Sequence, residues 1–152
     1  NRITDADFLN DFQINNLGAA AFIQAYLKNI KMSQSASVVL MSSVAGSVGL
    51  PFHASIAMAK GGIESFTRAL AAELAPSIRV NCVAPSLTNT PLGEKLLNTP
   101  EKMELMKKRN PLQKVGSPEE VGNVISFLLC EESAWISGQI LAVDAGMGSL
   151  KI

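Results

Sequence analysis

The sequence predicts an α/β fold in which about three parallel strands are flanked by helices. Segments with helical spacing of apolar residues alternate with short apolar runs, in the order helix, strand, helix, strand, helix, strand. The first such run, SVVLM at 37–41, is β-branched and lacks polar alternation, which is typical of a strand buried on both faces. Crossovers of this length imply parallel strands joined right-handedly, with helices on both faces of the sheet.

The first helix is expected over residues 4–31. Thr4 and Asp7 have the spacing of a capping box, and apolar residues follow at helical intervals as far as Leu27. Gly18 and the three alanines after it leave one face of this helix small. Such a face permits close approach to a neighbouring helix.

The second helix is predicted over residues 55–74, where it ends before Ala75 and Pro76. A strand follows at 78–83, and Pro85 is expected to stop it. Residues 86–115 carry three prolines around a charged helical stretch at 101–108. This composition predicts a loop-rich insertion with one or two helices, which favours a mobile lid.

The third helix has the strongest start signal in the chain. Ser117 is a suitable N-cap, Pro118 occupies the first helical position and Glu120 completes a capping box, so a helix is predicted over 118–131. The last strand is predicted at 139–143. Three strands are few for a doubly wound sheet, and the strand at 37–41 would have an open edge. The chain therefore looks like half of a larger sheet, and its first residue, Asn1, indicates a processed or truncated chain.

Composition limits the possible partners. The 152 residues make one domain, with 13 basic and 13 acidic side chains and no Lys/Arg block, which disfavours nucleic acid and anionic membranes as partners. No apolar run approaches the roughly 18 residues of a membrane span, and no signal-peptide pattern occurs, so we expect a soluble cytoplasmic protein. The charged fraction of 17% is low for a monomer and favours an oligomer.

The two cysteines show no metal-ligand or disulfide pattern. Cys82 and Cys130 are far apart, with no CxxC motif and no nearby His. Both are therefore predicted to be buried small hydrophobes in a reducing compartment, and no metal site is predicted.

Candidate site residues lie where a parallel sheet binds ligands. Ser43 follows the predicted strand at 37–41, and ligands of such sheets bind in the crevice outside the carboxyl ends of the strands. Asn15, Lys60 and the turn at 85–90 are placed at the same crevice. A lone lysine on a helix is usually a solvated charge, and Ser43 and Asn15 also have purely structural interpretations.

Several motifs resemble those of a known family. The motifs are INNLG (14–18), VVLMSSVAG (38–46), the Lys60 segment (57–90), SPEEVGNVISFLL (117–129) and SGQILAVDAG (137–146). They resemble the C-terminal half of the classical short-chain dehydrogenase/reductase family, and the order and spacing match over nearly the whole chain. The resemblance implies a Rossmann-like doubly wound sheet and an oxidoreductase that moves a hydride between NAD or NADP and a carbonyl or alcohol substrate. It also implies a homodimer or homotetramer.

The resemblance assigns roles residue by residue. Asn15 matches the Asn whose backbone carbonyl holds a relay water, and Ser43 matches the Ser that hydrogen-bonds the substrate oxygen. Lys60 matches the Lys that binds the nicotinamide ribose and lowers the pKa of the catalytic Tyr. The segment that contacts the nicotinamide amide and the phosphates contains Pro85, Leu87 and Thr90.

One departure concerns the proton. The family's general acid/base is a Tyr four residues before the Lys, and this sequence has Ile56 there. Loss of a positioned acid/base costs about 10²- to 10⁴-fold in rate. The only tyrosine is Tyr26, eleven residues beyond Asn15, and it is not expected to substitute. His53 titrates near neutral pH, but its position predicts a solvent-facing loop residue.

A second departure concerns the cofactor. The Gly-rich turn that receives the pyrophosphate has no counterpart, because neither GxGxxG nor GxxxGxG precedes a helix in this chain. We therefore expect residues 1–152 to be a partial Rossmann-like domain without its adenosine-binding half, and residues 86–115 to be its substrate loop. The sequence does not choose between NAD and NADP. A smaller departure is Ser86, where the family usually has Gly.

Two interpretations from different classes follow. One is a weak or inactive NAD(P)-dependent oxidoreductase. The alternative is an inactive binding or scaffold subunit that assembles through the helices at 4–31 and 55–74. A comparison of the full-length protein with an Ile56→Tyr variant would separate them.

Overall fold

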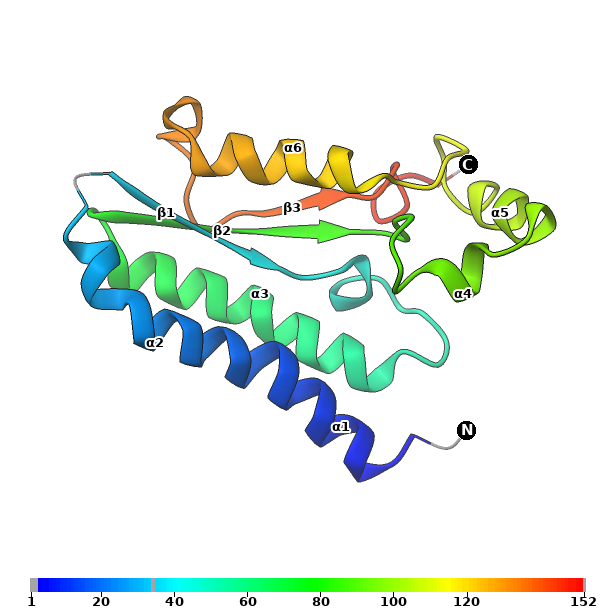
Figure 1. Cartoon of the computed structure of the whole chain (residues 1–152), viewed down its shortest axis with the longest axis horizontal. Helices are drawn as coiled ribbons and strands as arrows, with labels where there is room; N and C mark the ends of the chain where they lie inside the picture. Colours follow the sequence, from blue (N-terminus) through cyan, green and yellow to red (C-terminus); the bar gives the residue numbers. More distant parts are fainter. Residues whose placement is uncertain (1–2, 34, 152) are drawn as a thin grey trace.

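Three parallel strands with helices on both faces form the architecture of the computed structural model, which describes residues 3–33 and 35–151 (Figure 1). The strands pair in the order β1 (Ala36–Met41), β2 (Ile78–Pro85) and β3 (Ile140–Val143). This sheet confirms the predicted α/β class. The helical elements, in chain order, are α1 (Asp5–Phe12), the π-helical segment η1 (Gln13–Leu17), α2 (Gly18–Lys31), the 3₁₀ turn η2 (Val44–Gly46), α3 (Ala54–Leu74), α4 (Glu94–Leu97), α5 (Pro100–Lys107), α6 (Pro118–Leu129) and the 3₁₀ turn η3 (Glu131–Ser133).

The strand register brings the carboxyl ends of the strands to one edge of the sheet. Met41 of β1 pairs with Val83 of β2, and Pro85 of β2 pairs with Val143 of β3. Strand β2 runs two residues beyond its predicted end at Val83 and ends at Pro85, the residue that was expected to stop it. Pro85 lacks an N–H, but the bond from β2 to β3 at this point comes from the Ser86 amide, which donates to the Val143 carbonyl at 3.2 Å.

The first predicted helix is one helical rod, in which a π-helical segment lies between two α-helical segments. The capping box is present, with the Asp7 amide donating to Thr4 Oγ1 at 3.4 Å and the Thr4 amide to Asp7 Oδ2 at 2.8 Å. In η1 the Gly18 amide donates to the carbonyl of Gln13, five residues earlier. Such π segments are common at functional sites, and this one contains Asn15.

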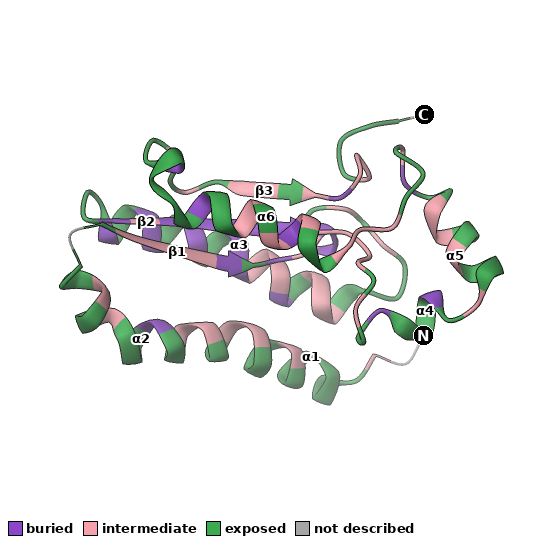
Figure 2. Ribbon diagram, turned by 45° about the horizontal axis from the view of Figure 1, so that its top comes forward, coloured by how far each residue is buried: buried purple, intermediate pink, exposed green. Residues whose placement is uncertain are grey.

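Each face of the sheet has its own apolar core. On one face α2 and α3 pack against β1 and β2 around Ile23, Ile63 and Val80. On the other face α6 packs through Val121 and Leu128 against Val83. Figure 2 shows that the buried residues concentrate in the sheet and in the helix sides that face it, while α1 and α2 remain largely exposed on their outer side.

Helix α6 has the predicted start and an earlier end. Ser117 Oγ accepts from the Glu120 amide at 3.3 Å, and Glu120 Oε2 accepts from the Ser117 amide at 3.0 Å. The helix ends at Leu129 because Cys130 adopts an extended conformation. Cys130 is consequently exposed, which overturns its predicted burial, whereas Cys82 is buried as predicted.

Residues 86–115 form the predicted loop-rich insertion with two short helices, α4 and α5. We refer to this segment as the arm. In Figure 1 α4 and α5 lie beyond the carboxyl ends of the strands. Several of its apolar side chains face solvent, and Leu92 is 93% exposed.

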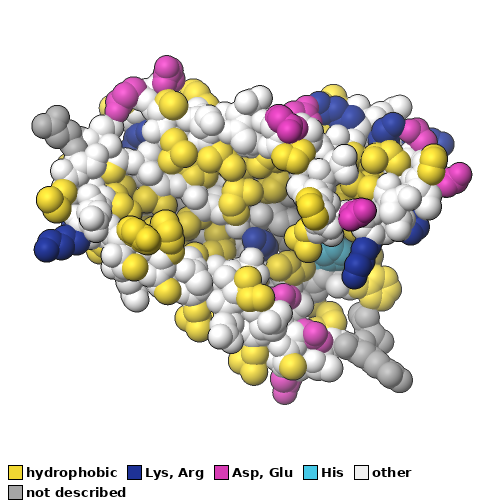
Figure 3. Space-filling view, in the orientation of Figure 1, with side chains coloured by type: hydrophobic (Ala, Val, Ile, Leu, Met, Phe, Trp, Pro, Cys, Tyr) yellow, Lys and Arg dark blue, Asp and Glu magenta, His cyan; other side chains and the backbone are white. Residues whose placement is uncertain are grey.

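One further surface is apolar. Figure 3, in the orientation of Figure 1, shows hydrophobic side chains gathered over β1, between α6 and the helices α2 and α3. In the described part of the chain β1 pairs only with β2, so its outer edge is open as the sequence predicted. No helix in residues 3–33 and 35–151 has the length and apolar character needed to cross a membrane.

Candidate functional site

Ser43 and Lys60 meet at the end of β1. The chain leaves the strand at Met41, and Lys60, on the second turn of α3, donates from Nζ to the Met41 carbonyl at 3.0 Å. Ser43 lies two residues further on, in an extended conformation, where its Oγ accepts from the Ala45 amide at 3.2 Å and so caps η2. The structure therefore brings these two predicted residues to the same strand end.

The ammonium of Lys60 is half-buried and carries no ion pair within the described residues. Burial lowers the pKa of Lys60 below its ordinary value, while the charge of Asp11 opposes this shift. A partly desolvated cation bound only to a backbone carbonyl retains N–H donors for a second partner. Neutral hydroxyl groups of a ligand suit such a donor.

Ile56 lies one helical turn before Lys60 on the same side of α3. Its side chain is half-buried and purely hydrocarbon. His53 lies outside the first turn of the helix, is exposed, and its Nδ1 is 2.7 Å from the Pro51 carbonyl. Because a carbonyl only accepts, Nδ1 is the protonated nitrogen in this contact. The prediction of a solvent-facing His53 is confirmed.

Tyr26 does not lie at the strand ends. It is on α2, 51% exposed, and its ring packs against Phe22 with centroids 4.7 Å apart. Eleven residues of helix separate it from Asn15, which is about 16 Å along the axis at 1.5 Å per residue. The only phenol in the chain is therefore remote from the π segment.

Asn15 lies on the π segment η1, which contacts α3 through the neighbouring Asn16. The Asn15 Nδ2 donates to the Asp11 carbonyl at 2.8 Å, and the Asp11 carboxylate is one of the charges that act on Lys60. The helix that contains the π segment thus passes near the Lys60 ammonium.

Asn16 makes a contact with α3 that was not predicted from the sequence. Its Nδ2 donates to the Ala59 carbonyl at 3.0 Å, and a Cβ on Gly62 would lie 2.5 Å from that nitrogen. Gly62 therefore allows η1 to approach the turn of α3 that carries Lys60. The signal in the sequence was a second Asn beside Asn15, which periodicity alone does not distinguish from a surface residue.

The turn after β2 is fixed by backbone bonds. Gly116 donates to the Leu87 carbonyl at 3.2 Å, and Thr90 Oγ1 accepts from the Gly93 amide at 3.3 Å. A Cβ on Gly93 would lie 2.6 Å from the Thr88 carbonyl, so this close turn requires glycine there. Pro85, Leu87 and Thr90 consequently occupy the strand end next to that of β1.

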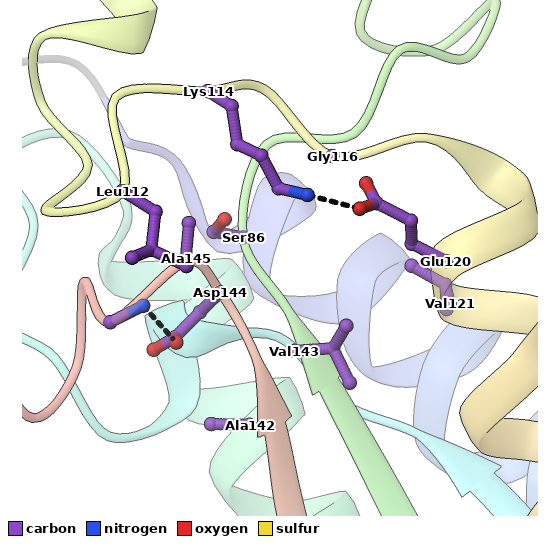
Figure 4. Close-up of a pocket in the computed structure, with 11 residues that line it drawn as sticks. Ser86, Leu112, Lys114, Gly116, Glu120, Val121, Ala142, Val143, Asp144 and Ala145 are labelled. Carbon is purple, nitrogen blue, oxygen red and sulfur yellow. Dashed lines mark hydrogen bonds and ion pairs between the residues drawn. The ribbon is translucent and has the colours of Figure 1, made fainter.

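A separate pocket of about 320 Å³ lies between the ends of β2 and β3, the arm and the start of α6 (Figure 4). Lys114 and Glu120 pair across its mouth, and Ser86 points toward its interior. Asp144 is buried, with Oδ1 accepting from the Gly146 amide at 2.9 Å and Oδ2 from the Gly148 amide at 2.7 Å. Asn15, Ser43 and Lys60 do not line this pocket.

Among the described residues, no three His, Cys, Asp or Glu side chains are grouped so that they could hold a metal ion. The polar groups at the ends of β1 and β2 are instead an ammonium, a hydroxyl and backbone groups.

Comparisons with known proteins found a matching family and several relatives. The family model described as enoyl-(acyl carrier protein) reductase matches residues 1–148. A tropinone reductase homolog from Arabidopsis thaliana is 43% identical over 118 residues, covering 77% of this chain and 45% of that protein. The 3-oxoacyl-[acyl-carrier-protein] reductase FabG of Thermotoga maritima is 37% identical over 148 residues, covering 96% of this chain and 59% of the relative.

A solved structure shows the same fold. The gluconate 5-dehydrogenase from Burkholderia cenocepacia, in complex with NADP and tartrate, aligns with a TM-score of 0.90 and 25% identity over 98% of this chain and 59% of that one. The chain thus spans about half the length of the curated relatives it matches.

Proposed function

Because this chain belongs to the short-chain dehydrogenase/reductase family, we propose that its strand-end site binds the nicotinamide end of NAD or NADP beside a small carbonyl or alcohol substrate. Both relatives above are named as reductases, and the gluconate dehydrogenase structure contains NADP. The half-buried ammonium of Lys60, which has no ion pair among the described residues, supports the proposal, because it offers donors to ribose hydroxyls next to a serine hydroxyl.

Each site residue has a distinct proposed role. The Ser43 hydroxyl donates to the substrate oxygen and polarises the carbonyl, while Lys60 orients the nicotinamide ribose. The backbone carbonyl of Asn15 holds a relay water. When bound, the nicotinamide supplies or accepts the hydride. The segment that contacts its amide and phosphates comprises Pro85, Leu87 and Thr90.

The side chain at position 56 bears on how active this site is. Reduction of a carbonyl needs a proton as well as a hydride, and Ile56 stands at the position that we assign to the family's tyrosine. A hydrocarbon cannot give or take a proton, and the missing acid/base costs about 10²- to 10⁴-fold. We therefore infer weak or absent turnover at a site that still retains its binding groups.

The domain assignment is also part of the proposal. Residues 1–152 form the part of a Rossmann-like domain that carries the nicotinamide and substrate sites, and residues 86–115 form the substrate loop. The Gly-rich turn for the pyrophosphate is not found in this sequence.

A second candidate function is an inactive binding or scaffold subunit. Large apolar side chains are exposed along one helical rod, including Leu9 at 69%, Leu17 at 53% and Phe22 at 60%. Together with the open sheet edge, this surface favours assembly into a homodimer or homotetramer.

The test compares the full-length protein with its Ile56→Tyr and Ile56→Phe variants. Oxidation of NADH and NADPH is followed with a panel of ketones. We expect turnover to rise about 10²- to 10⁴-fold only with Tyr, because Phe has the ring but not the acidic hydroxyl. Equal turnover in all three proteins contradicts the role assigned to position 56. Inactivity of all three favours the scaffold function.

A further inference from the structure

We propose that Glu64 is a positioning residue which, through the Ser42 hydroxyl, holds the turn carrying Ser43 against the turn of α3 carrying Lys60. The inference rests on the proposed function only in treating Ser43 and Lys60 as site residues. Neither the sequence motifs nor the comparisons assign a role to Glu64.

Glu64 is a buried carboxylate with a single side-chain partner. It is 8% exposed, and its Oε1 accepts from Ser42 Oγ at 2.9 Å. In the described part of the chain it belongs to neither ion pair. Burial of a carboxylate is unfavourable, so Glu64 depends on the hydrogen bond from Ser42, which is itself 3% exposed.

The Ser42 hydroxyl joins the two turns. Besides Glu64 it lies 3.2 Å from the Lys60 carbonyl and 3.4 Å from the Ser43 carbonyl. A hydroxyl donates one proton, and the carboxylate is the nearest and most strongly accepting of the three groups. The bond therefore connects α3 directly to the residue before Ser43.

Two consecutive turns of α3 form hydrogen bonds with two consecutive residues of the chain, Met41 and Ser42. Lys60 and Glu64 are four residues apart on one side of the helix; Lys60 binds the Met41 carbonyl, and Glu64 binds Ser42. When Lys60 leaves Met41 to hold a ribose, as the proposed function requires, the contact from Glu64 remains. It then keeps Ser43 in register with the helix.

Gly46 leaves room for this contact. A Cβ at Gly46 would lie 2.7 Å from Glu64 Oε1 and 3.1 Å from Ser42 Oγ. The Gly46 amide in turn donates to the Ser43 carbonyl at 2.9 Å. The short turn η2 is thus folded around the Glu64 carboxylate, and its amides report on the placement of Ser43.

The test uses the isotope-labelled full chain with Glu64→Gln and Glu64→Leu. Glutamine retains an acceptor for Ser42, whereas leucine retains only the volume. We measure hydrogen exchange at the Ala45 and Gly46 amides and the titration of the Lys60 ammonium by NMR. We expect leucine to speed exchange about tenfold and to give a Lys60 titration midpoint different from that of glutamine, because both variants remove the charge but only leucine removes the acceptor. Glutamine should leave exchange close to that of the unmodified chain.

Glu73 provides a matched control, because it is exposed on the same helix. Glu73→Leu should change neither readout. The proposal is overturned if Glu64→Leu behaves like this control. It is also overturned if Gln and Leu at position 64 change both readouts equally, because Glu64 would then act through its charge alone.

Ser42→Ala tests the same hydrogen bond from its donor side and serves if Glu64→Leu does not fold. Removal of the hydroxyl should speed exchange at Ala45 and Gly46 as leucine does, and unchanged exchange would contradict the proposal. These readouts require no hydride transfer. Failure of every variant to oxidise NADPH would therefore count against the proposed function, not against the role of Glu64.

Discussion

The strand-end site and the arm lie side by side but are built differently. Asn15 lies on η1, Lys60 lies on α3 and Ser43 directly follows β1. Hydrogen bonds tie these residues or their neighbours to backbone groups of other elements. The arm, residues 86–115, exposes four leucines by more than half of their surface: Leu92, Leu96, Leu105 and Leu112. The difference indicates that the binding groups depend on the sheet, whereas the arm can vary without unfolding it.

The largest effect should appear in the labelling rates of the two thiols, because one is buried in the sheet and the other lies on the surface. Burial raises the pKa of Cys82 to about 11, so about one thiol in a thousand is ionised at pH 8. Cys130 is exposed at the end of α6. We expect a thiol reagent to label Cys130 at least about 100-fold faster in the folded protein, as followed by mass spectrometry. Comparable rates would contradict the packing of β2.

The core beneath α6 should give the next largest effect. Leu128 has no exposed surface, and its neighbour Leu129 is 50% exposed. Leu128→Ala should lower the free energy of unfolding by about 2–5 kcal/mol, and Leu129→Ala by much less. Denaturant titration measures both, and equal losses would show that α6 does not pack as described.

The sequence predicted those parts of the molecule that depend on local signals. Both capping boxes, at Thr4 and Ser117, are present because they require only residues three apart. Burial of Cys130 was mispredicted because the end of α6 carries no glycine or proline signal, so the helix appeared two residues longer.

Residues of the site were predicted only where they belong to a recognised motif. Ser43 and Lys60 came from the resemblance, and the structure brings them to one strand end. Asn16 and Glu64 were missed, because their contacts join residues 43 and 22 positions apart. Such contacts exist only once α3 has packed against η1 and β1.

The helix cap of α6 should give a moderate effect. Ser117→Ala removes the acceptor for the Glu120 amide and should cost about 1 kcal/mol. Ser126→Ala, on the exposed side of the same helix, is the control. Thermal unfolding measures both, and a cost for Ser117→Ala no larger than the control would contradict the cap.

The arm should give the smallest effect on stability. Leu92 is 93% exposed, so Leu92→Ser should change the free energy of unfolding by less than about 0.5 kcal/mol. A loss above about 1 kcal/mol, measured by denaturant titration, would show that the arm is covered in solution, for example by another copy of the chain.

Binding of reduced nicotinamide mononucleotide tests the central claim most directly, because this probe contains only the part of the cofactor that we assign to this chain. In NMR titrations of the labelled protein, we expect shifts at Ser43, Lys60, Leu87 and Thr90, which Lys60→Met abolishes, and none at Leu129. Shifts confined to other residues, or no shift at millimolar probe, would contradict a nicotinamide site at these strand ends.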